Sequence, residues 1–180
     1  MKILFISDIH GIYDNLNHIN KIIKKENVDK LIVLGDLYYC GPTYSDKFEV
    51  NSSKVKDFLT NYSDMLICMR GNCDSDVDIK VSDFPICSGL SMLYVDDINI
   101  YITHGNEYSK EKNRKFNRKG ILVYGHEHIP YIEKDNDMIY INVGSISLPR
   151  NGNRPSYMIY ENKKFNIYDI DGKTIDKIKI

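Results

Sequence analysis

The chain has 180 residues, of which 42% are hydrophobic, and its formal net charge at pH 7 is −1. This length fits a single domain, residues 1–180, whose core needs no disulfide or metal for support. The near-neutral charge excludes bulk attraction to a nucleic acid polymer or to an anionic membrane as the basis of function.

The cysteines and the N-terminal sequence predict a cytoplasmic protein. Cys40, Cys68, Cys73 and Cys87 form neither a C-x-x-C pair nor a zinc-ribbon pattern, so reduced thiols are expected. The apolar run after Lys2 is only four residues long, which is too short for a signal-peptide core. No stretch approaches the roughly 20 apolar residues that a membrane-spanning helix needs.

The first half of the chain alternates apolar runs with amphipathic segments. Residues Lys2–Ile6, Lys30–Leu34 and Met65–Met69 are apolar runs of the kind that form buried strands. Asp14–Glu26 and Ser52–Asn61 place apolar side chains at helical spacing. The β-α-β-α-β order with continuous apolar strands predicts a sheet that is covered by helices.

The second half is rich in predicted strands. Six segments have strand-like patterns: Ser91–Val95, Ile98–Thr103, Ile121–Tyr124, Met138–Val143, Tyr157–Tyr160 and Lys164–Ile170. Asp96-Asp97 and Asp171-Gly172 fit hairpin turns. The polar segment Ser109–Asn117 is predicted as a helix. Together these patterns predict an α/β protein in which two sheets pack face to face.

Seven side chains of metal-binding type lie in short cassettes, most of which directly follow an apolar run. The cassettes are Asp8-Ile9-His10-Gly11, Gly35-Asp36, Gly71-Asn72, His104-Gly105 and Gly125-His126-Glu127-His128. Ligand sites in α/β sheets lie beyond the carboxyl ends of the strands, so we expect these seven groups to meet in one crevice. Seven donors are too many for one metal ion and about right for two.

Two cations held close together need an anion between them. Asp36 is the best candidate because it lies alone between two clusters of donors. A set of oxygen and imidazole donors without thiolate suits Mn²⁺, Fe²⁺, Zn²⁺ or Mg²⁺ better than a structural zinc ion. Two such ions about 3.5–4 Å apart can clamp a phosphoryl group.

The cassettes, taken in order, resemble those of the calcineurin-like metallophosphoesterases, whose pattern is D-x-H, G-D, G-N, H-G and G-H-x-H. More closely, the segments SDIHG, LGDLYYCGP, RGNCDS, THG, VYGHEHIP and NVGSISLPR resemble the YfcE-type group of bacterial phosphodiesterases. The likeness extends from Met1 to about Tyr160. It implies a four-layer α-β-β-α sandwich, in which two mixed sheets are flanked by helices.

The resemblance also implies an activity and a division of the ligands. The expected enzyme is a phosphoric diester hydrolase for small molecules, in which a metal-bridging hydroxide attacks phosphorus in line. One ion would be held by Asp8, His10, Asp36 and His128. The other would be held by Asp36, Asn72, His104 and His126. Asp36, Asn72 and His104 are the expected catalytic residues, and the expected ions are two Mn²⁺, with Zn²⁺, Fe²⁺, Mg²⁺ or Ni²⁺ as alternatives.

One departure from the wider superfamily concerns the residue after Asn72. Where many members have a histidine that is thought to protonate the leaving alkoxide, this chain has Cys73, as the YfcE-type group does. A thiol with an ordinary pKa of about 8.5 donates protons less readily at neutral pH than an imidazolium does. A preference for good, aryl-like leaving groups is therefore predicted. Alternatively, Cys73 only fills space beside the site.

Arg70 is a candidate contact for the substrate phosphate, or else a surface charge.

Several alternatives stay open on the sequence alone. Tyr38, Tyr39 and Tyr44 lie in the loop Tyr38–Asn51, where they could stack on an aryl or base group or pack the loop itself or a subunit contact. The same fold serves as a non-catalytic scaffold in the retromer complex, and a phosphomonoesterase would use a similar site. The physiological substrate, the native metal and the oligomeric state, including a homo-oligomer, are not determined.

Overall fold

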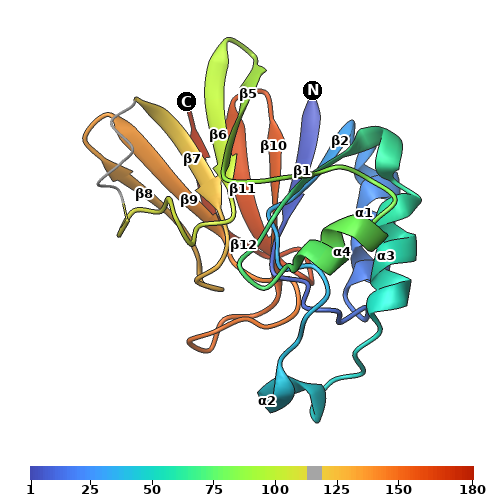
Figure 1. The fold of residues 1–180 in the computed structure, drawn as a ribbon. Coiled ribbons are helices and arrows are strands. Elements are labelled where there is room, and N and C mark those ends of the chain that lie inside the picture. The colour runs from blue at the N-terminus through green and yellow to red at the C-terminus, as the bar shows by residue number, and fades with distance from the viewer. Residues whose placement is uncertain (113–118) are drawn as a thin grey trace.

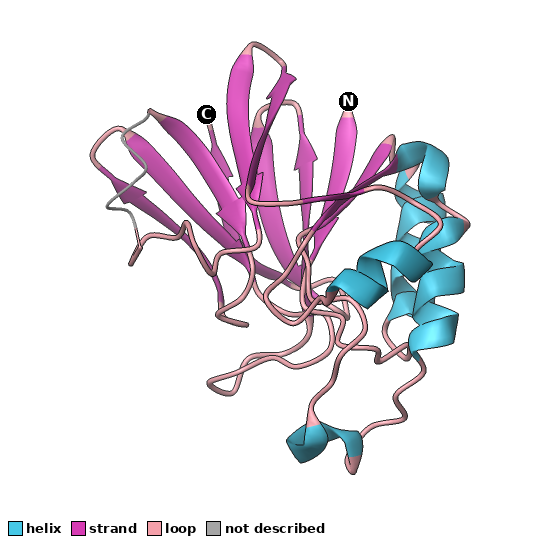
Figure 2. Cartoon of the chain, in the orientation of Figure 1, coloured by secondary structure: helices cyan, strands magenta, loops and turns pink. Residues whose placement is uncertain are grey.

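The computed structural model describes residues 1–112 and 119–180. Two β-sheets lie face to face, and helices cover the outer face of one of them (Figures 1 and 2). This arrangement confirms the predicted fold class of an α/β protein with two mixed sheets.

The larger sheet has seven strands among the described residues and carries the first cassettes. Its strands, in spatial order, are β12 (Thr174–Lys179), β11 (Lys164–Asp169), β10 (Ser156–Glu161), β1 (Lys2–Ile6), β2 (Lys30–Val33), β3 (Leu66–Met69) and β4 (Ile86–Cys87). Strands β1 to β4 are parallel, whereas β10, β11 and β12 are antiparallel to their neighbours. The parallel strands therefore end at the same edge of the sheet.

The second sheet has five described strands in the order β5 (Leu90–Val95), β6 (Ile98–Thr103), β7 (Gly120–Tyr124), β9 (Met138–Val143) and β8 (Pro130–Asp135). Strands β6, β7 and β9 are parallel, and the two outer strands pair with them in the antiparallel sense. Alternate residues face the larger sheet, so Ile102, Val123 and Ile141 pack with Phe5 and Ile32 in the core between the sheets.

The described helices are α1 (Leu16–Glu26), α2 (Pro42–Ser45), α3 (Ser52–Thr60), α4 (Asp76–Val81) and the 3₁₀ turn η1 (Ser63–Met65). Helices α1 and α3 bury residues such as Ile19 and Leu59 against Leu4, Ile6 and Leu31 of the larger sheet. Figure 1 shows α1, α3 and α4 on this side, with α2 standing apart on the long loop after β2. No helix in the described ranges is long and apolar enough to cross a membrane.

The outer face of the five-stranded sheet is covered differently from that of the larger sheet. Tyr101, Leu122 and Tyr124 are buried there, with Tyr108 packed against them. The predicted helix Ser109–Asn117 falls largely on residues 113–118, outside the described residues, and residues 109–112 are not helical.

The structure contains elements that sequence periodicity did not predict. Strand β4 has two residues, and β12 is an edge strand whose residues are mostly exposed, so neither has the apolar run of a buried strand. Strand β8 is also at an edge, and its second half is exposed. Helix α4 buries none of its six residues, so it has no apolar face to detect.

Candidate metal centre

The ends of five strands from the two sheets meet at one place. Asp8 and His10 follow β1, Asp36 follows β2, Asn72 follows β3, His104 follows β6, and His126 and His128 follow β7. The backbone N–H of His126 donates a hydrogen bond of 3.0 Å to Oδ2 of Asp8, so groups 118 positions apart are in contact. All seven predicted ligands are brought together, and His10, Asp36, Asn72, His126 and His128 line one cavity of about 200 Å³.

The backbone adopts a rare conformation at most of these positions. Asp8, His10, Asp36, His126 and His128 have φ angles of 56°, 52°, 55°, 66° and 62°. Each such left-handed non-glycine residue costs on the order of 1 kcal/mol or more, and such strain persists only where the surrounding structure fixes it. Hydrogen bonds between neighbouring loops, such as that from His10 N to Asp36 O at 2.9 Å, fix it here. Strain of this kind is typical of functional sites.

Two glycines allow the cassettes to approach each other. A Cβ atom on Gly125 would lie 2.0 Å from Oγ of Ser7 and 2.6 Å from Oδ2 of Asp8. A Cβ atom on Gly71 would lie 2.1 Å from Oδ1 of Asp36. Any other residue at these two positions would therefore push a carboxylate out of place.

Three imidazoles are oriented by backbone carbonyl groups. The Nδ1 atoms of His10, His104 and His128 lie 2.7, 2.8 and 2.6 Å from the carbonyl oxygens of Tyr39, Leu34 and Leu148. A carbonyl oxygen only accepts hydrogen bonds, so each Nδ1 carries the hydrogen and donates it. In the neutral imidazole, Nε2 then presents a lone pair to the centre. A hydrogen bond from the second ring nitrogen is the usual way in which proteins orient a metal-binding histidine.

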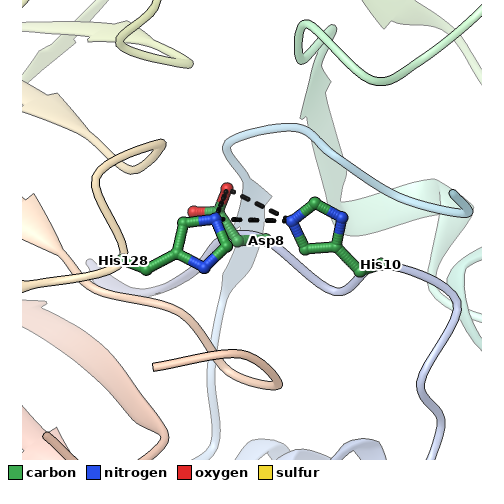
Figure 3. Close-up of side chains that lie close together, drawn as sticks. All are labelled: Asp8, His10 and His128. Carbon is green, nitrogen blue, oxygen red and sulfur yellow. Dashed lines mark hydrogen bonds and ion pairs between the residues drawn. The ribbon is translucent and has the colours of Figure 1, made fainter. Parts of the chain in front are cut away.

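Asp8, His10 and His128 form the first group of donors (Figure 3). The Nε2 atoms of the two histidines face each other at 3.4 Å, and Oδ1 of Asp8 lies 3.3 Å from Nε2 of His128. This oxygen is completely buried, yet no group in the described part of the chain donates a hydrogen bond to it. Burial of a carboxylate oxygen without a hydrogen-bond donor costs free energy. A cation bound by Oδ1 of Asp8 and the two Nε2 atoms would remove that cost. The donors therefore fit a divalent metal ion.

Asp36 connects this group with a second one. Its Oδ2 lies 3.6 Å from Nε2 of His10 and 3.4 Å from Nε2 of His104. Nε2 of His104 is also 3.0 Å from Oδ1 of Asn72, and the ring of His126 packs edge-on against His104 with 5.0 Å between centroids. Asp36 thus occupies the position between the two groups that a bridging ligand requires.

The charges of these residues compensate one another without a metal. Burial opposes ionisation of Asp8, but the neighbouring His128, His104 and His10 hold its pKa well below the usual range. Burial also acts against the charged form of His104, yet its hydrogen bond with Asp36 and the charge of Asp8 raise its pKa to about 9. In the metal-free protein, a proton on His104 therefore supplies positive charge at the centre.

Asp74 is a positioning residue that sequence reasoning missed. Its buried carboxylate accepts hydrogen bonds from the backbone N–H groups of Asp36, Leu37 and Gly71 at 2.9, 2.7 and 2.7 Å. It therefore fixes the loop after β2 to the loop after β3. Its position within the segment RGNCDS was visible in the sequence, but its partners Asp36 and Leu37 lie 38 and 37 residues away.

Ser145 has a similar role on the other side of the centre. Its hydroxyl donates to the carbonyl oxygen of Asp8 at 2.8 Å and accepts from the N–H groups of Ser147 and Leu148 at 3.2 and 2.8 Å. The loop that holds His128 through Leu148 O is thereby attached to the β1 cassette. Ser145 does not line the cavity, which agrees with a structural role.

The two predicted substrate contacts occupy different places. Cys73 lines the metal-centre cavity and donates its backbone N–H to Oδ1 of Asp36 at 2.8 Å, whereas burial and the Asp36 charge raise the pKa of its thiol to about 12. Arg70 lines a neighbouring cavity, donates from Nε to Asp74 O at 3.0 Å and pairs with Asp76 at 2.9 Å. The cation that lines the metal-centre cavity is Arg150, at the end of the segment NVGSISLPR.

This fold is that of a known class of proteins. Residues 1–164 match the calcineurin-like phosphoesterase superfamily domain, and the chain therefore belongs to the calcineurin-like phosphoesterase superfamily. The predicted family is confirmed.

Within the superfamily, the chain is similar to phosphodiesterase YfcE of Escherichia coli strain K12, with 30% identity over 175 residues that cover 97% of this chain and 95% of the relative. The solved structure of the E. coli phosphoesterase YfcE superposes with a TM-score of 0.93 and 30% identity over the full length of both chains. Phosphodiesterase MJ0936 of Methanocaldococcus jannaschii is 28% identical over 151 residues, covering 80% of this chain and 83% of that protein. The predicted YfcE-type resemblance is thus also confirmed.

Structures of the vacuolar sorting protein Vps29 share the fold at lower identity. The protein from Cryptosporidium parvum matches with a TM-score of 0.66 and 18% identity over 99% of this chain and 98% of that one. At this level of identity the likeness concerns the fold alone.

Proposed function

We propose that the chain is a phosphodiesterase that acts through two divalent cations and prefers esters with good, aryl-like leaving groups. The observation that carries this proposal is the arrangement of donors around Asp36. On one side lie Oδ1 of Asp8, which is buried and accepts no hydrogen bond in the described part of the chain, and the Nε2 atoms of His10 and His128. On the other side lie His104 and Asn72.

Each cation would have four protein ligands. Asp8, His10, Asp36 and His128 would hold one, and Asp36, Asn72, His104 and His126 would hold the other. When bound, two such ions activate a water molecule as the nucleophile and neutralise the charge that develops on the phosphoryl oxygens. Mn²⁺ is the proposed ion, because the donors are carboxylate, amide and imidazole, and burial raises the pKa values of the two thiols that line the cavity, Cys40 and Cys73.

Other residues of the cavity would orient the substrate. Arg150 lines the cavity, and its guanidinium would pair with two phosphoryl oxygens through two parallel hydrogen bonds. Asp36, which follows β2, lines the same cavity, so the phosphoryl group would be held between Arg150 and the cations at Asp36. Such positioning lowers the barrier by converting an encounter of separate groups into a reaction within one complex.

The proposed preference for aryl leaving groups follows from Cys73. This residue stands at the cavity, where a proton donor to the departing oxygen would be needed, and its thiol has a pKa of about 12. A group with so high a pKa gives little general acid catalysis at neutral pH. Esters whose leaving oxygen departs readily without a proton should therefore be the better substrates.

The proposed activity can be tested with chromogenic esters. Protein treated with EDTA should not hydrolyse bis(4-nitrophenyl) phosphate, and addition of Mn²⁺ should restore turnover, with 4-nitrophenyl phosphate hydrolysed more slowly. Faster hydrolysis of the monoester would instead identify a phosphomonoesterase. Absence of turnover with both esters, together with absence of bound metal, would favour a scaffold protein.

A further inference from the structure

A second cavity beside the metal centre offers an aromatic surface. This cavity, here called the aromatic pocket, has a volume of about 530 Å³. Its walls include Tyr38 and Tyr39 from the loop after β2, Lys56 from α3, Cys73 from the loop after β3, and Val81 from the end of α4. Tyr39 is 57% exposed, so its aromatic side chain is available to a ligand.

The aromatic pocket adjoins the metal-centre cavity directly. Tyr39 and Cys73 line both spaces. The backbone oxygen of Tyr39 accepts the hydrogen bond that orients His10, at 2.7 Å, so the position of this tyrosine is tied to a predicted ligand. A phosphodiester bound at the metal centre would therefore extend one of its arms past Cys73 and Tyr39 into the pocket.

The two charged side chains on the walls of the pocket, Lys56 and Asp78, already have partners. Nζ of Lys56 pairs with Asp83 at 2.8 Å. The carboxylate of Asp78 accepts hydrogen bonds from the N–H and hydroxyl of Ser75 at 2.7 and 2.8 Å. An anionic arm would thus have no free cation to pair with among the described residues that line this pocket, whereas an uncharged planar group would meet apolar and aromatic surface.

The cavity on the other side of the metal centre is lined by polar and charged residues in place of aromatic ones. It has a volume of about 360 Å³, adjoins the site at Asn72, and is lined by Arg70, Asp74 and Glu107 among others. No aromatic residue of the described ranges lines it. Of the two arms of a diester, an aromatic one would therefore be favoured on the Cys73 side.

We propose that the aromatic pocket binds a planar aromatic group on the leaving arm of the substrate, with Tyr39 as the residue that determines this specificity. The proposal rests on the proposed phosphodiesterase function. Rings that pack edge-to-face or with an offset attract each other beyond the burial of their surface. A phenolic aryl group and a nucleobase share this chemistry.

The test separates ring recognition from the acidity of the leaving group. Methyl 4-chlorophenyl phosphate and methyl hexafluoroisopropyl phosphate release alcohols of similar acidity, but only the first carries a ring. The wild-type, Mn²⁺-loaded enzyme should favour the aryl ester in kcat/KM by roughly two- to tenfold, the range expected for an aromatic pair. Tyr39→Leu, which keeps the carbonyl that orients His10, should remove this preference, and Tyr39→Phe should keep it.

Two further variants control for indirect effects. Tyr44 is an exposed aromatic residue that lines the metal-centre cavity but not the aromatic pocket, so Tyr44→Leu should leave the ratio unchanged. Val81 lines the aromatic pocket but not the metal-centre cavity and is 49% exposed, so Val81→Trp should fill the pocket and lower the ratio. Equal kcat/KM values for the two esters in the wild type, or an unchanged ratio in both Tyr39→Leu and Val81→Trp, would overturn the proposal.

A binding measurement distinguishes failure of this inference from failure of the proposed function. Methyl(phenyl)phosphinate and dimethylphosphinate cannot be hydrolysed, and calorimetry should show tighter binding of the phenyl compound that is lost in Tyr39→Leu. If neither ester turns over but this difference persists, only the proposed activity fails. In the enzyme that hydrolyses the two esters, inhibition by methyl adenosin-5′-yl phosphate is compared with inhibition by its base-free ribosyl analogue. Base-dependent inhibition that Tyr39→Leu abolishes shows that the pocket accepts a nucleobase, whereas equal inhibition by the two compounds excludes a nucleobase and leaves a phenolic aryl group.

Discussion

At the scale of single residues, the centre depends on which nitrogen of each histidine carries the hydrogen. His10, His104 and His128 all donate from Nδ1 to a backbone carbonyl. Their Nε2 atoms converge on Asp8 and Asp36, at distances between 3.3 and 3.9 Å. The main chain thereby presents the donors before any cation is bound, so metal binding would not require the histidines to reorient.

The raised pKa of His104 makes metal binding dependent on pH. Because the metal-free protein holds a proton on His104 up to a pKa of about 9, and a metal ligand must be deprotonated, binding has to release that proton. We expect the apparent affinity for Mn²⁺ to rise with pH until about 9, with about one proton or more released per chain near pH 7.5. Calorimetric titrations in two buffers of different ionisation enthalpy measure this number. Zero protons released near pH 7.5 would show that His104 is not a ligand.

Cys73 is expected to limit the range of leaving groups. Cys73→His would place a group with an ordinary pKa of about 6.5 at the same position, where it can donate a proton at neutral pH. We expect kcat/KM for an alkyl diester to rise by about tenfold or more, since general acid catalysis contributes about 100-fold or more when well placed. Cys87→His alters an exposed, free cysteine and serves as the matched control. An equal response of the two variants would argue against the proposed role of Cys73.

The seven predicted donors could be inferred from the sequence because each lies within two positions of a glycine or another donor near the end of an apolar run. Asp74 and Arg150 could not be inferred in the same way. Asp74 acts through backbone groups of distant loops, and Arg150 reaches the cavity only because its backbone N–H is bonded to the carbonyl of His128. Such contacts follow from the tertiary structure and leave no pattern of spacing.

At the scale of elements, loops rather than helices position the ligands, and Asp74 joins two of these loops. Asp74→Asn would keep one oxygen but replace the other by an NH₂ group that faces backbone N–H donors. Leaving such a buried donor unpaired costs about 1–3 kcal/mol, so the free energy of unfolding of the metal-free protein should fall by about that amount. Urea denaturation in EDTA measures it.

The control for Asp74 is the neighbouring Asp76. Its carboxylate is exposed and pairs with Arg70 at 2.9 Å, and such surface pairs contribute about 1 kcal/mol or less. Asp76→Asn should therefore change stability much less than Asp74→Asn. Equal losses for the two variants would show that the Asp74 carboxylate does not hold the loops together.

Most elements that the sequence predicted correctly have a buried apolar face. Strands β1, β2 and β7 and helices α1 and α3 each bury several apolar side chains, which produces a readable period. Helix α4 has no such face. The capping box formed by Ser75 and Asp78 was the local sequence feature that could have indicated the start of this helix. The edge strand β12 has mostly exposed side chains, and the second half of the edge strand β8 is exposed, so neither shows that period.

At the scale of the whole molecule, the two sheets contribute complementary halves of the centre. Asp8, Asp36 and Asn72 follow strands of the larger sheet, and His104 and the His126-x-His128 cassette follow strands of the smaller one. Bound cations would therefore join the two sheets at one edge. The sequence predicted two packed sheets, but the order of strands, with β10 beside β1 and β9 beside β7, depends on pairings between distant segments that periodicity does not encode.

The number of metal ions per chain tests the central claim most directly. Protein loaded with Mn²⁺ and freed of excess ion should contain two Mn²⁺ per chain by elemental analysis. Asp36→Asn, which removes the carboxylate between the two groups of donors, should contain fewer than two. Asp137→Asn, which alters an exposed carboxylate paired with Lys119, should still contain two. One ion or none in the wild-type protein, or two ions retained by Asp36→Asn, would contradict a two-metal centre bridged by Asp36.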